Sequence, residues 1–174
     1  MNVSNGWTGK LLSVNLSNSE VSTQEIPEEW KRKYIGARGY GIRLLYDLTG
    51  PETNPFGPEN VIVIASGPLT GTMAPSSSRC EIVSKSPLTG IYARGDCGGT
   101  FGPIMKYAGY DAILVRGRAE KPVYIWVEDE KVEIRDADGI WGLDVWEARE
   151  KILEAHEPAS PNQKRFLPPS GSYS

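Results

Sequence analysis

The chain has 174 residues, of which 39% are hydrophobic and 24% are charged, and its formal net charge is -3. This composition is typical of a globular protein, and the length favours one domain with a hydrophobic core. The acidic balance excludes the concentrated basic face that nucleic acids require, and no window approaches the ~18 apolar residues of a membrane span. We therefore expect no nucleic-acid partner and no membrane partner. MNVSNGWTGK lacks the apolar segment of a signal peptide, which favours a cytoplasmic location.

The first part of the chain predicts a hairpin followed by two helices. Alternating apolar residues predict strands over residues 7–16 and 20–26, and Ser-Asn-Ser between them is typical of a turn. Pro27, followed by acidic and then basic residues, predicts a short helix. A glycine-rich loop over residues 35–41 precedes a helix predicted from Ile42 to Leu48. This loop lacks the G-x-G-x-x-G spacing, which excludes a dinucleotide-binding fold.

The rest of the chain predicts further short strands and helices. The continuous apolar run VIVIA at residues 61–65 predicts a strand buried on both faces. Other strands are expected at residues 80–84, in DAILVRG and on both sides of an EDEK turn, with helices at 102–107 and 143–155. We expect one loop-rich α+β or β domain over residues 1–155, in which Trp141 and Trp146 are packed in the core or against a helix rather than forming a stacking platform. Residues 156–174 are rich in proline and serine and predict a disordered or extended tail.

Cysteine and histidine are scarce, which limits the chemistry that the chain supports. Cys80 and Cys97 are the two cysteines and form no C-x-x-C motif, so they cannot supply a four-thiolate cluster or zinc site. Two free thiols are favoured over one disulfide. The single histidine, His156, is expected to be a solvated surface residue. No nucleophile-histidine pair is indicated.

The strongest candidate for a binding site lies in residues 67–102. The tetrapeptide PLTG occurs here twice, at residues 68–71 and 87–90, among many glycines that can expose backbone N–H groups to an anion. Arg79 and Arg94 suit bidentate phosphate contacts, and Asp96 adds a carboxylate of the kind that holds Mg²⁺ beside phosphates. The alternative is two ordinary turns, with the arginines and Asp96 paired to each other or solvated, Cys97 a small buried residue, and Arg38 a surface charge.

A series of motifs resembles the N-terminal domain of the aldehyde ferredoxin oxidoreductase family. In chain order they are GWTGKLLSVNLS, YIGARGYG, GPLTGT, KSPLTG, GDCGGTFG, MKYAGYDAILVRGRAEKPVYI and VEIRDADGIWG, and they span residues 6–155. The resemblance implies an α+β fold in which two mainly antiparallel or mixed β-sheets and a few short helices form a saddle. The saddle carries a tungsten bis-pterin cofactor, tungstopterin, with Mg²⁺ bridging the pterin phosphates.

The resemblance also implies roles for particular residues. Arg79 and Gly98 stand at positions that contact the tungstopterin, and Cys97 and Gly99 belong to the same cofactor-binding segment. Asp96 replaces an Asn whose backbone carbonyl helps to hold the Mg²⁺, so we expect the metal site there, with Mg²⁺ or Arg79 offsetting the added charge. None of these residues is expected to be catalytic. We interpret the two PLTG copies as two sides of one binding site.

The resemblance further implies a function for a larger enzyme. Family members oxidise aldehydes to carboxylic acids and pass electrons through a [4Fe-4S] cluster to ferredoxin. They continue for several hundred residues, and the cluster ligands are expected in that later part. The ending PPSGSYS looks like a truncated or frame-shifted end. We expect a cofactor-binding N-terminal domain that is inactive alone. The alternatives are a standalone pterin-binding module and an assembly subunit that docks onto a separately encoded catalytic remainder.

Overall fold

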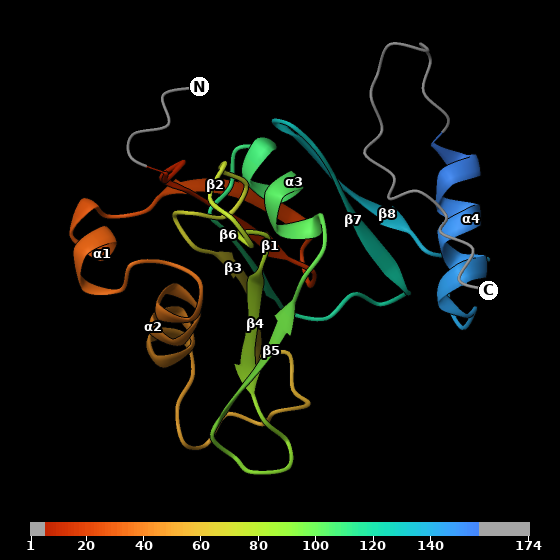
Figure 1. Cartoon of the computed structure of the whole chain (residues 1–174). Coiled ribbons are helices and arrows are strands. Elements are labelled where there is room, and N and C mark those ends of the chain that lie inside the picture. Colours follow the sequence, from red (N-terminus) through yellow and green to blue (C-terminus); the bar gives the residue numbers. More distant parts are fainter. Residues whose placement is uncertain (1–5, 157–174) are drawn as a thin grey trace.

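A six-stranded mixed sheet forms the centre of the computed structural model, which describes residues 6–156 (Figure 1). The strand order is β2-β1-β6-β3-β4-β5; β1 and β6 are parallel, and the other neighbours are antiparallel. The strands are β1 (Lys10–Asn15), β2 (Glu20–Glu25), β3 (Val61–Ser66), β4 (Cys80–Lys85), β5 (Tyr92–Cys97) and β6 (Ala112–Arg116). A separate antiparallel pair consists of β7 (Val123–Glu128) and β8 (Lys131–Asp136).

Four short helices complete the described part of the chain. They are α1 (Glu28–Lys33), α2 (Arg38–Leu48), α3 (Phe101–Tyr107) and α4 (Val145–Ala155). Within residues 6–156, no helix has both the length and the apolar character needed to cross a membrane. Two sheets of mixed and antiparallel strands with a few short helices confirm the α+β class expected from the sequence.

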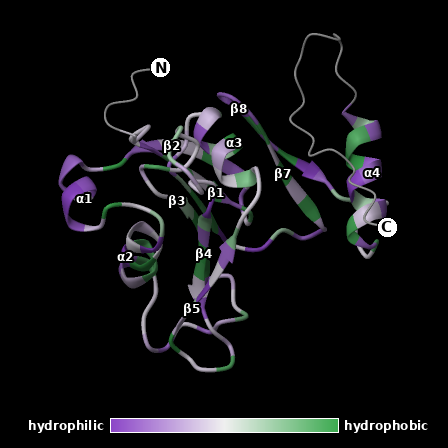
Figure 2. Ribbon diagram, in the orientation of Figure 1, coloured by the Kyte–Doolittle hydropathy of each residue, from purple (hydrophilic) through white to green (hydrophobic). Residues whose placement is uncertain are grey.

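Both faces of the central sheet are covered by apolar groups. On one face, Tyr40, Leu44 and Leu45 of α2 pack with residues such as Val63 and Val83. On the other face, Leu12 and Val14 pack with Met105 of α3 and with apolar side chains of β7 and β8. Figure 1 shows α2 on one side of the sheet and the β7–β8 pair on the other, whereas Figure 2 shows α1 as hydrophilic over most of its length. The sheet thus lies between two apolar layers.

The expectation for the VIVIA run is confirmed in part. Val61, Val63 and Ala65 are buried, and Ile64 packs against the second apolar layer. Ile62, however, is 48% exposed, because the covering elements do not reach that point of the second face. The remaining expected strands and helices are present, and the EDEK turn shortens to two residues because Glu128 and Lys131 are already paired.

Helix α2 begins at Arg38, four residues before the start expected from the sequence. Two glycines that suggested a loop lie inside its first turns, and packing explains them. A Cβ at Gly39 would lie 2.0 Å from the carbonyl oxygen of Tyr34, and a Cβ at Gly41 would lie 2.5 Å from Cγ2 of Val83. Because a side chain does not fit at either position, glycine lets the helix approach β4 and the preceding turn closely.

Strand β5 was not expected from the sequence, in which no strand was predicted between the second PLTG and α3. The structure pairs all six of its residues with β4, from Lys85↔Tyr92 to Cys80↔Cys97. Most of its side chains are exposed, so no buried apolar face marks it in the sequence. Asp96 and Cys97 therefore lie on a strand, and the predicted binding segment is held by a sheet.

A buried ion pair joins the end of α3 to the start of β6. Lys106 Nζ lies 2.6 Å from Asp111 Oδ1, and the two side chains are 6% and 0% exposed. The carboxylate also accepts hydrogen bonds from the backbone N–H groups of Thr8 and Gly9, at 3.1 and 2.8 Å. Lys106 donates a further hydrogen bond to the carbonyl oxygen of Gly6, at 2.5 Å. This pair ties the beginning of the described chain to the core.

The last part of the fold corrects two expectations. Helix α4 is capped by Asp144, which accepts hydrogen bonds from the N–H groups of Trp146 and Glu147, but Trp141 and Trp146 are each 74% exposed rather than packed inside. His156 is not a solvated residue, because its ring lies 3.9 Å from that of Trp126 and contacts Arg135. Beyond His156, the expected tail at residues 157–174 lies outside the described residues.

Strain precedes α2, and it leads to a testable expectation. Ile35 has φ 67°, a conformation that β-branched residues rarely adopt, and its side chain is 61% exposed. Replacing Ile35 with Gly removes about 1–2 kcal/mol of strain and adds about 0.5–1 kcal/mol of backbone entropy, so the free energy of unfolding rises slightly, by up to about 1 kcal/mol. Urea titration measures this change. Ile91, which is 64% exposed and has no positive φ, supplies the control, since Ile91→Gly should destabilise the chain.

Candidate functional site

Pairing between β4 and β5 gathers charged side chains on the sheet face that α2 covers. Glu81 lies opposite Asp96, and Arg94 lies opposite the buried Val83. Arg94 contacts both carboxylates, at 3.3 Å from Glu81 and 3.0 Å from Asp96. Arg38, the first residue of α2, contacts Glu81 at 2.8 Å, and Arg79 lies 4.0 Å from Asp96. We call these five residues, Arg38, Arg79, Glu81, Arg94 and Asp96, the arginine cluster.

The arginine cluster contains three guanidinium groups and two carboxylates, which leaves one positive charge. Removal from water alone would raise the pKa of Asp96, but Arg94 beside it brings that pKa below its usual value. The hydrogen bond to Glu81 raises the pKa of Arg38. Asp96 is therefore ionised at neutral pH. The side chain of Arg79 is 73% exposed and touches Asp96 at the distance limit of an ion pair, so it is the most available of the three cations.

The sequence predicted Arg79 and Asp96 as neighbours in one site, and the structure brings them together. It also adds Glu81, which sequence reasoning did not single out, and gives Arg38 a partner where a lone surface charge was the alternative. A signal for Glu81 was present, because residues two apart on a strand face the same way. Arg79 stands one residue before a predicted strand and Glu81 is the second residue of that strand. Continued alternation therefore predicts that Glu81 and Arg79 face the same side of the sheet.

Cys97 points away from the arginine cluster, although it adjoins Asp96 in the sequence. Successive residues of a strand face opposite sides of the sheet, and the residue paired with Cys97 is Cys80 on β4. Both cysteines are free thiols, as the sequence indicated. Burial, with Cys97 as neighbour, raises the pKa of Cys80 to about 11. A contact between the Cys97 side chain and a ligand at the arginine cluster is not supported by this geometry; a role for its backbone stays a prediction.

Gly98 and Gly99 follow β5 and complete the predicted segment. Gly99 has φ 78°, which explains glycine there by backbone conformation. Gly98 has no such requirement, and a Cβ built on it would meet no atom within 4 Å; the same is true of Gly95. The fold itself therefore tolerates a side chain at both positions. Gly98 leaves open space beside the backbone that follows Asp96 and Cys97, whereas Gly95 faces the same side of the sheet as Cys97, away from the arginine cluster.

The two PLTG copies do not form two sides of one site, which corrects the interpretation made from the sequence. The first copy follows β3, whose last residue Ser66 pairs with Cys80 at the start of β4, and the second copy follows the end of β4 at Lys85. The copies therefore lie at opposite ends of β4. Arg79 and Asp96 meet because β5 runs back along β4 after the second copy.

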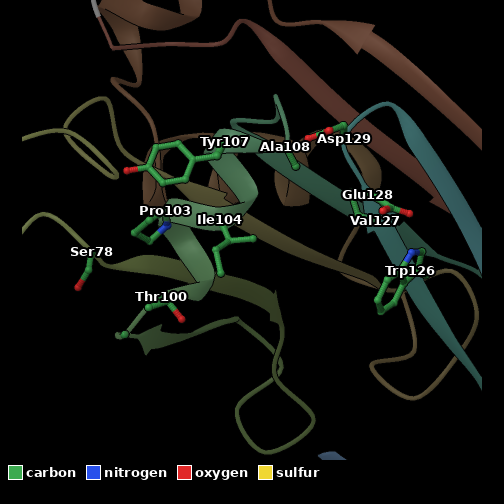
Figure 3. A pocket seen from close by; sticks show the side chains of 11 residues that line it. Ser78, Thr100, Pro103, Ile104, Tyr107, Ala108, Trp126, Val127, Glu128 and Asp129 are labelled. Atoms are coloured by element: carbon green, nitrogen blue, oxygen red, sulfur yellow. The ribbon is translucent and has the colours of Figure 1, made fainter. Parts of the chain in front are cut away.

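A cavity of about 690 Å³ lies between α3 and β7, on the other face of the sheet (Figure 3). Figure 3 shows Pro103 and Ile104 of α3 on one side of it and Trp126 of β7 on the other. Gly99 and Thr100 line its rim, but none of the five members of the arginine cluster lines it. Its lining is mainly apolar, so the cavity does not provide the cationic groups that a phosphate requires. The candidate anion site is the arginine cluster.

The described residues provide few protein ligands for a metal ion. Between residues 6 and 156, no group of three or more His, Cys, Asp or Glu side chains is placed to hold one. Asp96 is the acidic residue of the arginine cluster that lies two positions before Gly98 in the sequence, and its carboxylate already contacts Arg94. Mg²⁺ is commonly bound through one or two carboxylates together with ligand phosphates, so a complete all-protein site is not needed for such an ion.

The fold and the cluster define an α+β domain with an arginine-lined surface at the end of one strand pair. The chain belongs to the aldehyde ferredoxin oxidoreductase family. The family described as "Aldehyde ferredoxin oxidoreductase, N-terminal domain" matches residues 11–165. The match runs past residue 155, at which the sequence resemblance was expected to end.

Curated relatives and one solved structure agree with this assignment. The tungsten-containing aldehyde ferredoxin oxidoreductase of Pyrococcus horikoshii is 44% identical over 92% of this chain and 28% of that protein. That of Pyrococcus furiosus is 49% identical over 84% of this chain and 24% of that protein. An aliphatic sulfonate oxidoreductase, WOR-like subunit, of P. furiosus is 36% identical over 91% of this chain and 26% of its own length.

Among solved structures, the active-site complex BamBC of benzoyl coenzyme A reductase, in complex with 1,5-dienoyl-CoA, matches with a TM-score of 0.85 and 35% identity. The match covers 87% of this chain and 23% of that chain. The chain thus spans roughly a quarter of the length of the relatives that it matches.

Proposed function

We propose that this chain forms the N-terminal, tungstopterin-binding part of a tungsten-containing aldehyde:ferredoxin oxidoreductase. The complete enzyme would oxidise aldehydes to carboxylic acids in the cytoplasm and pass electrons through a [4Fe-4S] cluster, held outside this chain, to ferredoxin. The observation that best supports this proposal is that Arg79 and Gly98 lie at the same end of the β4–β5 strand pair. The family resemblance assigns both residues to the cofactor. The 44% and 49% identical relatives are named as tungsten enzymes of this kind.

The residues present fit a pterin that carries a phosphate. A phosphate needs cationic donors, and the arginine cluster carries a net positive charge with the Arg79 guanidinium 73% exposed. A flat ring system needs close approach to the backbone, and Gly98 leaves open space that the fold does not itself require. Both features lie at the Cys97 end of β5, so one ligand can use them together.

The proposal gives each residue of the arginine cluster a role. Arg79 would bind the phosphate directly, while Arg94 and Arg38 hold Glu81 and Asp96 in place and limit their repulsion of the phosphate. Asp96 would hold Mg²⁺ together with the phosphates of the ligand. Tungstopterin supplies the two-electron oxidation when it is bound, and the protein supplies binding and orientation. Because the site as assigned offers no proton-transfer group, we expect the isolated chain not to oxidise aldehydes.

The alternative is a pterin-binding or assembly subunit without activity of its own. Its support is that the described residues have apolar layers on both faces of a complete sheet, as a separately folding unit requires. Co-purification of the chain with a second polypeptide that carries the cluster cysteines favours this alternative. Purification of one long polypeptide that contains both parts favours the proposed enzyme.

A chimera tests the proposed function. Residues 6–156 replace the corresponding segment of the P. horikoshii relative, and tungsten and pterin content per chain are measured together with aldehyde-dependent reduction of a viologen dye. We expect the chimera to contain the cofactor, and Arg79→Ala to lower cofactor affinity by about ten- to a hundredfold, since one charged hydrogen bond is lost.

Glycine substitutions provide the matched pair. Gly98→Ala should lower the tungsten and pterin content while leaving the unfolding midpoint unchanged, because the fold leaves room for its methyl group. Gly50→Ala is the control, since Gly50 is equally uncrowded and has no positive φ but lies before β3, away from the arginine cluster. Unchanged cofactor content in both Arg79→Ala and Gly98→Ala would overturn the proposed site.

A further inference from the structure

Cys80 and Cys97 lie directly opposite each other on β4 and β5. Residues directly opposite on antiparallel strands have Cα atoms about 4.5 or 5.5 Å apart, according to the type of pair. Both values fall within the range of about 4.4–6.8 Å that a disulfide spans. The two side chains also share one face of the sheet, because paired residues point the same way. The backbone is therefore already placed for a bond between the two sulfur atoms.

The surroundings of the pair agree with this placement. Cys80 is 0% exposed, and its Sγ lies 3.8 Å from the carbonyl oxygen of Cys97, so it faces the partner strand. Cys97 is partly exposed and lies at the sheet edge that β5 forms. Both are reduced thiols in this structure. The Cys97 thiol is thus accessible from solvent, and the Cys80 thiol beside it is buried.

We propose that Cys80 and Cys97 form an oxidisable dithiol site, which small-molecule disulfides of the glutathione class convert into a bond between β4 and β5. The sulfur of Cys97 attacks one sulfur of the small disulfide, breaks its S–S bond and releases one small thiol. The sulfur of Cys80 then attacks that of Cys97 and releases the second small thiol. In total the protein loses two hydrogen atoms, that is, two protons and two electrons, and the small disulfide takes them up and is reduced to two thiols.

The bond would act at the end of the strand pair that carries the arginine cluster. Arg79 immediately precedes Cys80, and Gly98 immediately follows Cys97, so the crosslink would hold the two sides of the proposed cofactor site at one separation. It would also close a loop that contains the second PLTG and the whole β4–β5 turn. A loop of this size should raise the unfolding midpoint by about 5–10 °C when the crosslink forms.

Mass spectrometry of the chain tests the proposal. The reduced chain is incubated with oxidised glutathione, quenched by alkylation under denaturing conditions and digested. We expect a product that is lighter by two hydrogen atoms, has no alkylated cysteine and yields one peptide pair joined through Cys80 and Cys97. Accumulation of a glutathione adduct at Cys97, a crosslink between two chains, or two thiols that stay alkylatable would each overturn the proposal.

Single variants test the order of events. In Cys80→Ala the glutathione adduct at Cys97 should persist, because no second thiol can displace it. In Cys97→Ala the buried Cys80 should stay reduced over the time in which the unsubstituted chain is fully oxidised. An equally fast adduct at Cys80 in Cys97→Ala would contradict attack through Cys97. The crosslinked peptide from the unsubstituted chain decides the proposal even where a variant fails to fold.

Discussion

Replacing Asp111 with Asn should lower the free energy of unfolding by about 3–5 kcal/mol, the loss that follows when one member of a buried ion pair is removed. Asp111 and Lys106 are 0% and 6% exposed, so water cannot take the place of the missing charge. The substitution keeps the size of the side chain, and the effect is therefore electrostatic. Denaturant titration followed by tryptophan fluorescence measures it.

The carboxylate of Asp111 has three partners that an amide cannot serve together. It accepts from Lys106 at 2.6 Å and from the N–H groups of Thr8 and Gly9 at 3.1 and 2.8 Å. In an asparagine one of the two terminal atoms is itself a donor, so it would face a donor on one side. The ammonium group of Lys106 would keep the carbonyl oxygen of Gly6 as a partner but lose its counter-charge.

Two comparisons make this prediction decisive. Glu29→Gln removes the acidic partner of Lys33 in a pair whose side chains are 64% and 59% exposed, and it should change stability by less than about 0.5 kcal/mol. Adding Lys106→Met to Asp111→Asn should recover part of the loss, because the unpaired buried charge disappears. A loss below about 1 kcal/mol in Asp111→Asn would show that the pair does not hold the N-terminal segment to the core.

The sequence predicts those elements whose pattern reflects burial. Leu12 and Val14 face the second apolar layer, as their alternation predicts, and the helix that contains Leu44 and Leu45 has its apolar spacing, so the hairpin and the helices are found. Leu11 and Ser13 are buried as well, which the alternation did not predict. Strand β5 is different: it is an exposed edge strand of sequence YARGDC, and its pairing with β4 is a tertiary interaction. No local periodicity records such a pairing, so no strand was expected there.

The same limit applies to the candidate site. The types of residue identified Arg79 and Asp96, and the family resemblance gave them roles. Arg79 and Asp96 are close together because of the register between β4 and β5. The same register places the Cys97 side chain on the other face of the sheet. Packing against distant residues explains Gly39 and Gly41, which the sequence alone could not distinguish from loop glycines. Composition thus indicates a site, but strand register decides which side chains share it.

Replacing Asp96 with Asn should increase the affinity of the chain for pyrophosphate by about tenfold when Mg²⁺ is absent. Pyrophosphate is the probe because it offers the phosphate charges of the proposed cofactor without its rings. The carboxylate of Asp96 lies 3.0 Å from Arg94 and 4.0 Å from Arg79, so it competes with a phosphate for both cations. Repulsion between two unit negative charges about 5 Å apart is about 0.8 kcal/mol in bulk water and about 3 kcal/mol at an effective dielectric constant of about 20. For a partly exposed carboxylate we take about 1.4 kcal/mol, between these limits, which corresponds to this factor.

Adding Mg²⁺ should reverse the order of the two proteins. In the unsubstituted chain the ion can bind between Asp96 and the phosphates, so pyrophosphate affinity should rise on addition of Mg²⁺. The Asp96→Asn chain lacks the charged ligand, and its affinity should rise less. Calorimetric titration of both proteins, with and without the ion, gives four dissociation constants. If Asp96 binds the metal, Mg²⁺ lowers the dissociation constant by a larger factor in the unsubstituted chain than in Asp96→Asn. Glu133→Gln is the matched control, because Glu133 is 35% exposed and paired with Arg135 on β8, much as Asp96 is 37% exposed and paired with Arg94.

The four constants separate charge balance from metal binding. If Asp96→Asn binds pyrophosphate more tightly both with and without Mg²⁺, then Asp96 repels the phosphate but does not hold the ion. If the substitution changes neither value, then the phosphate does not bind beside Asp96, and the arginine cluster only stabilises the strand pair. If only the unsubstituted chain responds to Mg²⁺, the Asp96 carboxylate acts as a metal ligand. In that last case Arg94 would keep the ionised Asp96 in place while the ion is absent, since the two already form an ion pair.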